Sequence, residues 1–279
     1  MKETGSEMNG SILEVCNLGM QFGGVAALHD VCYSVPGGII QAVIGPNGAG
    51  KTTLFNCISG MLKPSYGRIV FNGREIAGRA PHKIAESGIS RTFQHVALFK
   101  KMTVLENVML GRHPRTGCGF LAAGLRLPGT RFEERQILQK GMEYLEFVGL
   151  ADVAGLEAGT LPLGKQKILE IARALATEPR LVLLDEPAGG LNMKETEDLG
   201  ELIEAIRRLG TTVMLVEHDM NLIMDISDRI LVLHFGKVLA SGTPGEIKEN
   251  SAVIEAYLGI EESDAAPSGT AQGGNDAGY

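Results

Sequence analysis

The feature that most constrains this chain is a glycine-rich loop that fits the pattern G-x-x-x-x-G-K-[ST]. Residues 39–44 before the loop are mostly apolar and typical of a buried strand, and Leu54, Phe55 and Ile58 after it have the spacing of one helix face. In a strand–loop–helix unit, backbone N–H groups and a helix N-terminus can face a phosphate together. The sequence therefore predicts a nucleotide-binding loop formed by Gly45, Pro46, Asn47, Gly48, Ala49, Gly50, Lys51, Thr52 and Thr53.

Two residues of this loop carry chemistry of their own. Lys51 is expected to reach the β- and γ-phosphates of a nucleotide, and the Thr52 hydroxyl is expected to bind Mg²⁺. The loop alone does not define the activity, because kinases, GTPases and motor proteins share it. The rest of the chain has to decide between them.

A pair of acidic residues follows a second apolar strand at residues 181–184. Asp185 is placed to hold Mg²⁺ directly or through water, and Glu186, which points elsewhere, to orient an attacking water or take its proton. Without a phosphate loop nearby, solvated strand-end acids would be an equally good interpretation. His218 follows the strand 213–216 and could contact a γ-phosphate, although a lone histidine at a strand end more often has a structural role.

The charge balance argues against a nucleic-acid partner. The chain has 279 residues and a net charge of −7, whereas duplex-binding proteins usually carry a basic balance or stripe. We expect no secretory signal, because residues 1–10 are polar, and no membrane span, because no apolar run approaches ~20 residues. Four scattered cysteines without metal-ligand spacing favour a reduced cytosolic protein.

Strands that alternate with helices predict a mainly parallel α/β sheet, with ligands at the carboxyl ends of its strands. Thr103 and Glu106 have capping-box spacing and predict a helix start. Residues 112–135 are rich in Arg, Gly and Pro, and they fit either an irregular surface excursion or a partner-docking element. Phe22 lies beside glycines and could stack on a base or join the core; its local sequence favours the core.

Several motifs occur in the order found in ABC-type ATPases, which the chain resembles over about residues 11–258. They are the phosphate loop, Gln94, Gly164-Lys165-Gln166 before an amphipathic helix, Leu183-Leu184-Asp185-Glu186-Pro187 and Glu217-His218-Asp219. Further stretches resemble the LivG-type ATP-binding subunit of branched-chain amino acid importers, namely Phe22-Gly23-Gly24, Arg91-Thr92-Phe93-Gln94, Ala256-Tyr257-Leu258-Gly259 and residues 119–135, 169–175, 186–192 and 216–220.

The resemblance implies the fold class. It is an α/β P-loop NTPase with a RecA-like core, an antiparallel β subdomain and a helical subdomain inserted at about residues 95–178. We expect residues 11–260 to form a single ABC ATPase domain after a flexible N-terminus at residues 1–10. Residues 261–279 are expected to be a disordered tail, because they contain no core-forming run.

The resemblance also implies a role for each matching residue. Phe22 would stack on adenine, which replaces the core interpretation. Gln94 would sense the γ-phosphate through Mg²⁺ and water, Glu186 would be the catalytic base and His218 the switch residue. The cofactors would be ATP and Mg²⁺, and the metal ligands would be Thr52, Gln94 and Asp185.

The implied partners are transmembrane permease subunits, a second ABC ATPase subunit and, indirectly, a periplasmic or extracellular solute-binding protein. This chain would lie on the cytoplasmic face of the cell membrane. The helical region between Gln94 and Gly164 would form the groove for a coupling helix of the permease, and residues 190–192 would lie across the dimer interface. Branched-chain amino acids are the default solute, with other amino acids, amides and aromatic acids left open.

The signature loop departs from the family pattern, which typically begins Leu-Ser-Gly-Gly-Gln and holds the γ-phosphate bound by the partner chain. Here the stretch begins Leu161-Pro162, and a proline has neither a hydroxyl nor an N–H to donate. We therefore expect a heterodimer in which this chain's own site is active and the site opposite Pro162 is weaker, with a homodimer left open. The signature residues are Pro162, Leu163, Gly164, Lys165 and Gln166.

The main hypothesis is a peripheral ATPase subunit that powers uptake of branched-chain or related amino acids, and two alternatives stand beside it. A non-transport ABC ATPase of the DNA-repair or translation-factor type usually carries a long coiled-coil insertion or a second cassette, neither of which is seen in this sequence. A regulatory nucleotide-binding module without turnover is disfavoured by Glu186 and His218.

Overall fold

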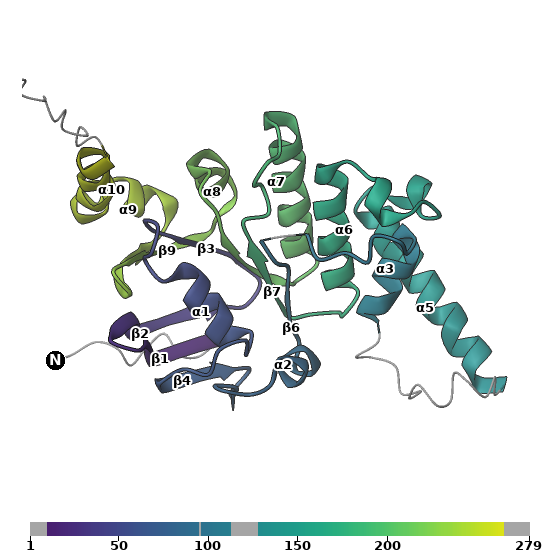
Figure 1. Cartoon of the computed structure of the whole chain (residues 1–279), viewed down its shortest axis with the longest axis horizontal. Helices are drawn as coiled ribbons and strands as arrows, with labels where there is room; N and C mark the ends of the chain where they lie inside the picture. Colours follow the sequence, from purple (N-terminus) through teal and green to yellow (C-terminus); the bar gives the residue numbers. More distant parts are fainter. Residues whose placement is uncertain (1–9, 95, 113–127, 265–279) are drawn as a thin grey trace, which may run out of the picture.

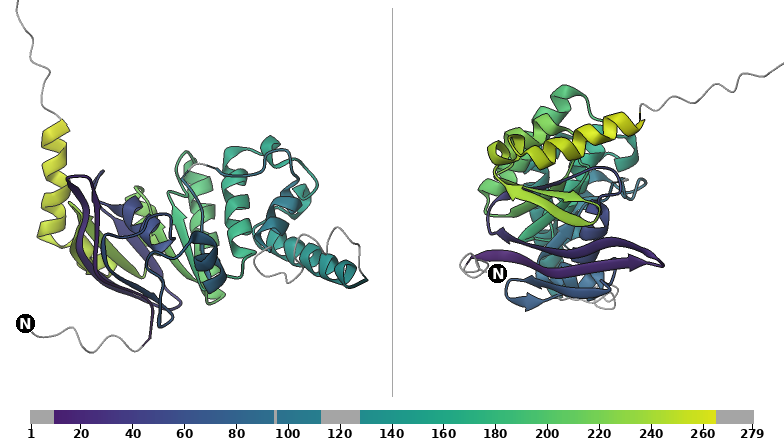
Figure 2. Two further views of the ribbon diagram at one scale, coloured as in Figure 1. Left: turned by 60° about the horizontal axis from the view of Figure 1, so that its bottom comes forward. Right: turned by 90° about the vertical axis from the view of Figure 1, so that its left-hand side faces the viewer.

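The computed structural model describes residues 10–94, 96–112 and 128–264, without the side chains of 128–134 and 258–264. Two β-sheets face each other on one side of the molecule, and a group of helices extends from the other side (Figure 1). Helices α10 and α5 lie at opposite ends of this arrangement (Figure 2).

The first sheet is antiparallel and has the strand order β2-β1-β4-β5. Its strands are β1 (Ser11–Phe22), β2 (Val25–Pro36), β4 (Tyr66–Phe71) and β5 (Arg74–Glu75). β4 and β5 are joined at Asn72 and Gly73, which both have left-handed backbones with φ of 48° and 71°. This pair of positive φ angles fits the right-handed twist of the two strands, so Asn72 and Gly73 form a tight hairpin turn.

The second sheet supplies the parallel core, with the strand order β10-β9-β3-β8-β7-β6. Five neighbouring strands, β9, β3, β8, β7 and β6, run parallel to one another, whereas β10 pairs antiparallel with β9. All residues of β3, β7 and β8 are buried, as expected for strands covered on both faces. The strands are β3 (Ile40–Ile44), β6 (Ile89–Arg91), β7 (Leu181–Asp185), β8 (Thr212–Val216), β9 (Arg229–His234) and β10 (Lys237–Gly242).

Helix α1 (Lys51–Ile58) lies between the two sheets (Figure 1). The apolar face predicted for it is confirmed, because Leu54, Phe55 and Ile58 are fully buried in the core shared by both sheets. A second core covers the opposite face of the parallel sheet and includes residues of several later helices. The helices of the sheet layers are α2 (Pro81–Ser87), α7 (Met193–Arg208), α8 (Met220–Ile226), α9 (Pro244–Lys248) and α10 (Ser251–Asp264).

A third core belongs to the helices between β6 and β7. The predicted capping box starts α3, since Glu106 N–H donates to Thr103 Oγ1 and Thr103 N–H donates to the Glu106 carboxylate. This is the segment in which an inserted helical subdomain is predicted, and its boundaries stay a prediction. Its elements are α3 (Val104–Gly111), α5 (Pro128–Phe147), the 3₁₀ helices η2 (Ala151–Val153) and η3 (Ala158–Thr160), and α6 (Leu163–Leu175).

α6 ends at Leu175, because Glu178 has a left-handed backbone and its N–H closes a turn on the Leu175 carbonyl. α10 continues to Asp264, so its last turn includes the first residues of the predicted tail, 261–264. Besides residue 95, three segments lie outside the described residues: residues 1–9, the rest of the tail from residue 265, and residues 113–127, which belong to the stretch rich in Arg, Gly and Pro.

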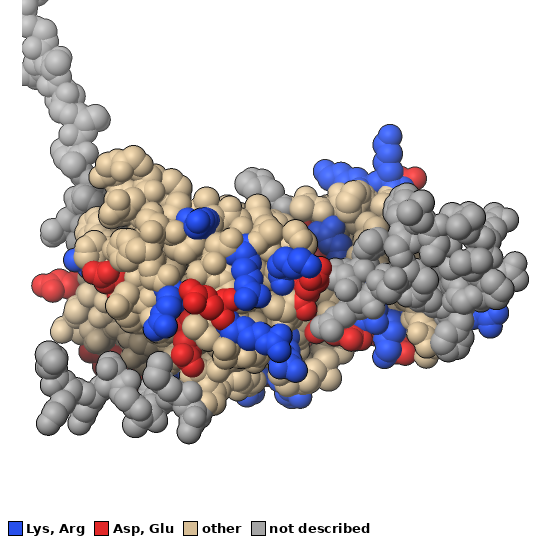
Figure 3. All heavy atoms as spheres, turned by 90° about the horizontal axis from the view of Figure 1, so that it is seen from below, with Lys and Arg blue, Asp and Glu red and all other residues tan. Residues whose placement is uncertain are grey.

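The surface seen in Figure 3 carries Lys and Arg side chains next to Asp and Glu side chains. On this face, charges of both signs are therefore interspersed over the described part of the chain. Within the same described ranges, none of the helices combines the length and the apolar character that a membrane crossing requires.

Candidate functional site

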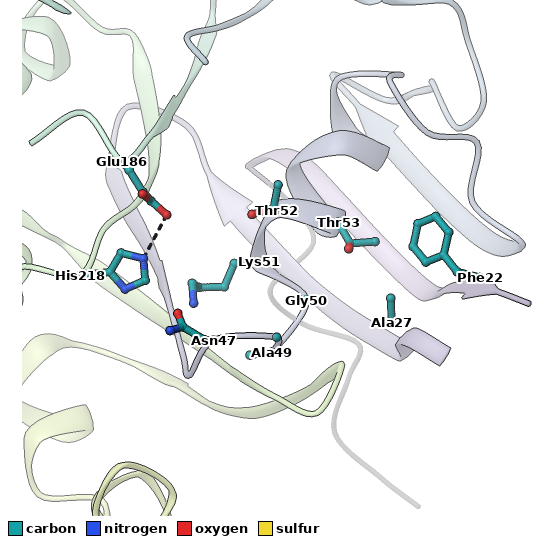
Figure 4. Close-up of a pocket in the computed structure, with 11 residues that line it drawn as sticks. Phe22, Ala27, Asn47, Ala49, Gly50, Lys51, Thr52, Thr53, Glu186 and His218 are labelled. Carbon is teal, nitrogen blue, oxygen red and sulfur yellow. Dashed lines mark hydrogen bonds and ion pairs between the residues drawn. The ribbon is translucent and has the colours of Figure 1, made fainter. Parts of the chain in front are cut away.

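A pocket of about 370 Å³ opens where the parallel strands end (Figure 4). The strand register explains its position: Val43 and Asp185 both lie opposite Val216, so the carboxyl ends of β3, β7 and β8 meet at one edge. The pocket is large enough for part of a nucleotide. It is lined by Phe22, Ala27, Asn47, Gly48, Ala49, Gly50, Lys51, Thr52, Thr53, Glu186 and His218.

The phosphate loop depends on glycine at two close approaches. Gly45 has φ of 147° and a Cβ there would collide with the carbonyl of Leu233, while Gly50 has φ of 101° and a Cβ would lie 2.6 Å from the Ala27 carbonyl. Both conformations are open to glycine because it has no Cβ. Gly50 caps α1, so the loop leads directly to a helix N-terminus that faces the pocket.

Lys51 is the first residue of α1, and its ammonium turns back onto the backbone of the loop. Its Nζ donates to the carbonyl oxygens of Gly45 at 2.6 Å and Pro46 at 3.0 Å, and the side chain is buried. Burial lowers the pKa of Lys51, against the opposing effect of the negative charges of Glu186 and Asp185. The loop thus holds a cation at the position where the sequence predicts phosphate binding.

Phe22 lies at the outer side of the pocket, at the end of β1. Its side chain is 49% exposed and lines the pocket with Ala27 and the loop. The core position favoured by its local sequence is therefore wrong, whereas the stacking position implied by the family resemblance fits this geometry. A flat apolar ring at the mouth of a phosphate pocket can cover the face of a base.

Glu186 is held by two side chains that the sequence singled out. Gln94 Nε2 donates to Glu186 Oε2 at 2.8 Å, and His218 Nε2 lies 3.0 Å from Glu186 Oε1. Burial would raise the pKa of Glu186, but the hydrogen bonds from His218 and Gln94 outweigh it and bring that pKa below its ordinary value. The carboxylate is therefore ionised at neutral pH, and an ionised acceptor requires the proton to be on Nε2 of His218.

Asp185 is buried beneath the pocket and does not line it. Its side chain is 4% exposed, and its Oδ2 accepts a 2.7 Å charge-assisted bond from Arg91 Nη2. Arg91 also donates to Asn56 Oδ1 of α1 and to Oγ of Ser59, the C-cap of α1, so the guanidinium joins the helix after the phosphate loop to the acidic strand end. Arg91 occurs in a stretch used for the resemblance, but nothing in its local sequence indicated this contact.

The predicted Mg²⁺ ligands are a hydroxyl, an amide and a carboxylate. Oxygen donors of these kinds are the ones that Mg²⁺ prefers. Gln94 donates from its Nε2, which leaves its amide oxygen as an acceptor. The donor types of Thr52, Gln94 and Asp185 therefore suit the ion; Thr52 lines the pocket, whereas Asp185 would have to share its carboxylate between the ion and Arg91.

The signature residues lie apart from this pocket. Pro162 is the N-cap of α6 without a side-chain cap bond, and Leu163 and Lys165 are exposed. Gly164 is buried against the Glu195 carboxylate, and Gln166 Nε2 donates to the Leu161 carbonyl. The signature loop therefore does not contribute to the chain's own pocket, and its role toward a partner chain stays a prediction.

Three residues that sequence reasoning missed take part in the site. Arg91 binds Asp185, Lys167 Nζ donates to the backbone carbonyl of Glu186 at 3.0 Å, and Glu217 accepts from the backbone N–H groups of Ala188 and His218. Each is charged and largely buried, which is unusual for a residue without a specific partner. Burial of a side chain depends on tertiary packing, so apart from the motifs beside these residues no local signal points to it.

A phosphate loop, an acidic strand end and a histidine at the next strand end together define a P-loop ATPase. A model of the family described as ABC transporter matches residues 28–189, and one described as branched-chain amino acid ATP-binding cassette transporter matches residues 237–263. The chain therefore belongs to the ABC transporter family of ATPases.

Relatives agree with this assignment. The high-affinity branched-chain amino acid transport ATP-binding protein BraF of Pseudomonas aeruginosa is 48% identical over 90% of this chain and 99% of its own length. LivG of Escherichia coli K12, which carries the same description, is 45% identical with the same coverage. The resemblance to LivG-type subunits is confirmed, and these relatives support the transport hypothesis rather than the non-transport alternative.

Solved structures confirm the predicted fold class. A nucleotide-free ATP-binding cassette from an ABC transporter superposes with a TM-score of 0.78 at 32% identity, over 88% of this chain and 98% of that one. A dimeric post-hydrolysis cassette bound to ADP and phosphate superposes with a TM-score of 0.71 at 25% identity, over 83% of this chain and 98% of that one.

Proposed function

We propose that this chain binds and hydrolyses ATP to drive the import of branched-chain amino acids through membrane permease subunits. The observation that carries the proposal is the Glu186 carboxylate, fixed by Gln94 and His218 at the edge of the phosphate-loop pocket. The naming of relatives such as BraF and LivG supports branched-chain amino acids as the solute. The chain would work on the cytoplasmic face of the membrane.

The chain's own residues supply the parts of the reaction. Loop amides and Lys51 bind the β- and γ-phosphates, and Phe22 stacks on the adenine. Glu186 orients the attacking water and accepts its proton, while His218 and Gln94 keep the carboxylate aimed at that water. Mg²⁺, held by Thr52, Gln94 and Asp185, would neutralise charge on the phosphates when bound.

A surface near Gln94 suits a permease segment. Phe93, next to Gln94 in the chain, is exposed, and it lines a groove of about 200 Å³ together with Met61 and residues of α2. Exposed apolar side chains that line one groove are typical of a protein interface. We propose that a permease segment docks here, so that Gln94 lies between the membrane subunit and Glu186.

The test of this function uses the chain assembled with its membrane subunits and a solute-binding protein. ATP hydrolysis is measured with and without leucine. Stimulation by leucine supports the proposal. A rate of ATP hydrolysis that no branched-chain amino acid changes would contradict the assigned solute. An assembled complex that does not hydrolyse ATP would contradict the ATPase role.

Replacing Phe22 with alanine is expected to weaken ATP binding by about 5- to 30-fold, because base–aromatic stacking contributes about 1–2 kcal/mol. Phe22→Tyr keeps the ring and should bind within about twofold of the wild type. Equilibrium binding of a fluorescent ATP analogue measures both. Phe99→Ala, another exposed phenylalanine, is the matched control; equal affinity of Phe22→Ala and wild type would contradict adenine stacking.

The signature loop gives a prediction about the second site. In a dimer, Pro162→Ser restores a hydroxyl and an N–H at the start of α6, where the partner's phosphate would lie. If the site opposite Pro162 is weak, ATPase activity of the assembled complex should rise to about twice its value, because two sites then turn over instead of one. An unchanged rate would show that Pro162 does not limit that site.

A further inference from the structure

The backbone of Glu186 is strained and needs support. Its φ is 48°, in the left-handed region that non-glycine residues rarely adopt. Such residues cluster at functional sites and persist only where their surroundings fix them. In this chain the support comes from β8, since Glu186 N–H donates to the Val216 carbonyl at 2.9 Å, and from two buried charged side chains.

The first of these side chains is Lys167, in the second turn of α6. It is 9% exposed, and its Nζ donates to the Glu186 carbonyl oxygen at 3.0 Å. That oxygen also accepts the Gly189 N–H at 3.2 Å, so the ammonium fixes the turn that follows Glu186. Burial lowers the pKa of Lys167, and the negative charge of Glu217 is the largest effect opposing that shift.

The second is Glu217, which is 5% exposed between the two strand ends. Its Oε1 accepts from the Ala188 N–H at 2.6 Å, and its Oε2 accepts from the His218 N–H at 2.9 Å. One carboxylate therefore joins the turn after Glu186 to the backbone of His218. Neither Lys167 nor Glu217 lines the pocket, so neither is placed to touch a nucleotide.

We propose that Lys167 and Glu217 are positioning residues for ATP hydrolysis, which hold Glu186 and His218 in register for their mutual hydrogen bond. The inference rests on the proposed hydrolytic role of Glu186.

The experiment compares Lys167→Met, which removes the ammonium at similar length, with Lys167→Arg, which keeps a donor. In the assembled complex, Lys167→Met should lower kcat by about 10- to 100-fold, as expected for a misplaced catalytic group. KM for ATP and binding of a fluorescent ATP analogue should stay within about twofold of the wild type, and Lys167→Arg should recover most of the rate. Lys194→Met, an exposed lysine on α7, is the matched control.

A second pair of variants separates positioning from general damage. Glu217→Gln places an amide N–H₂ against a backbone N–H and should lower kcat in the same way, without a change in ATP affinity. In a Glu186→Gln background, Lys167→Met should lower the residual single-turnover rate by no more than about twofold, because Lys167 acts through Glu186.

Four results would overturn the inference: unchanged kcat in Lys167→Met, unchanged kcat in Glu217→Gln, loss of ATP binding together with kcat, or a full further loss in the Glu186→Gln background. If Lys167→Met does not fold, Glu217→Gln and its double variant decide the question by the same criteria. A wild-type complex that does not hydrolyse ATP would instead contradict the proposed function, so the two failures are distinguishable.

Discussion

Replacing Glu186 with glutamine is expected to lower kcat for ATP hydrolysis by about 10²- to 10⁴-fold, the range for loss of a general base. Glutamine keeps the size of the side chain and one hydrogen-bond acceptor beside Gln94 and His218, but it cannot accept the proton of the attacking water. ATP should still bind, because Lys51 and the loop amides are unchanged.

Steady-state hydrolysis and binding of a fluorescent ATP analogue, measured on the same assembled complex, separate these two effects. The matched control is Glu197→Gln, an exposed acid on α7 that pairs with Lys194. The control should keep the wild-type rate within about twofold. A Glu186→Gln complex that retains a large part of the wild-type kcat would show that another group accepts the proton.

Replacing Lys51 with methionine should abolish nucleotide binding at cellular concentrations. Its ammonium is expected to turn from the Gly45 and Pro46 carbonyls to the phosphates. Each hydrogen bond from a charged group contributes about 1.5–3 kcal/mol, so the loss of two should weaken ATP binding by about 100-fold or more. Hydrolysis should be lost in parallel.

The measurement is a binding titration of the purified chain with a fluorescent ATP analogue, together with a thermal unfolding curve. Lys63→Met, an exposed lysine outside the site, is the control for charge removal. An unchanged midpoint of unfolding in Lys51→Met would show that the variant is folded. Wild-type affinity in that folded variant would contradict the placement of the phosphates in this loop.

The phosphate loop and its flanks could be predicted because their signals are local. A strand, a tight glycine turn and a helix follow one another in the chain, and each is specified by residues within a few positions. The capping box of α3 is predictable for the same reason, since Thr103 and Glu106 are three residues apart. Structural features that are set by residues within one turn of each other can therefore be predicted from the sequence alone.

The contacts that complete the site act over long distances and could not be predicted locally. The sequence placed Glu186 and His218 at strand ends, but their contact depends on the order of β7 and β8 in the sheet. Arg91 reaches Asp185 from another strand, and Phe22 is exposed because its strand extends past the core. These facts arise from tertiary packing, which overrides local preference.

The most direct test of the account is ATP-driven uptake of labelled leucine into vesicles that contain the complete transporter, with ATP on the side of this chain. The account predicts uptake that requires ATP and is abolished by Glu186→Gln, with the Glu197→Gln control unchanged. If leucine uptake continued at the wild-type rate in the Glu186→Gln complex, hydrolysis at this site would not power transport, and the central claim would be wrong.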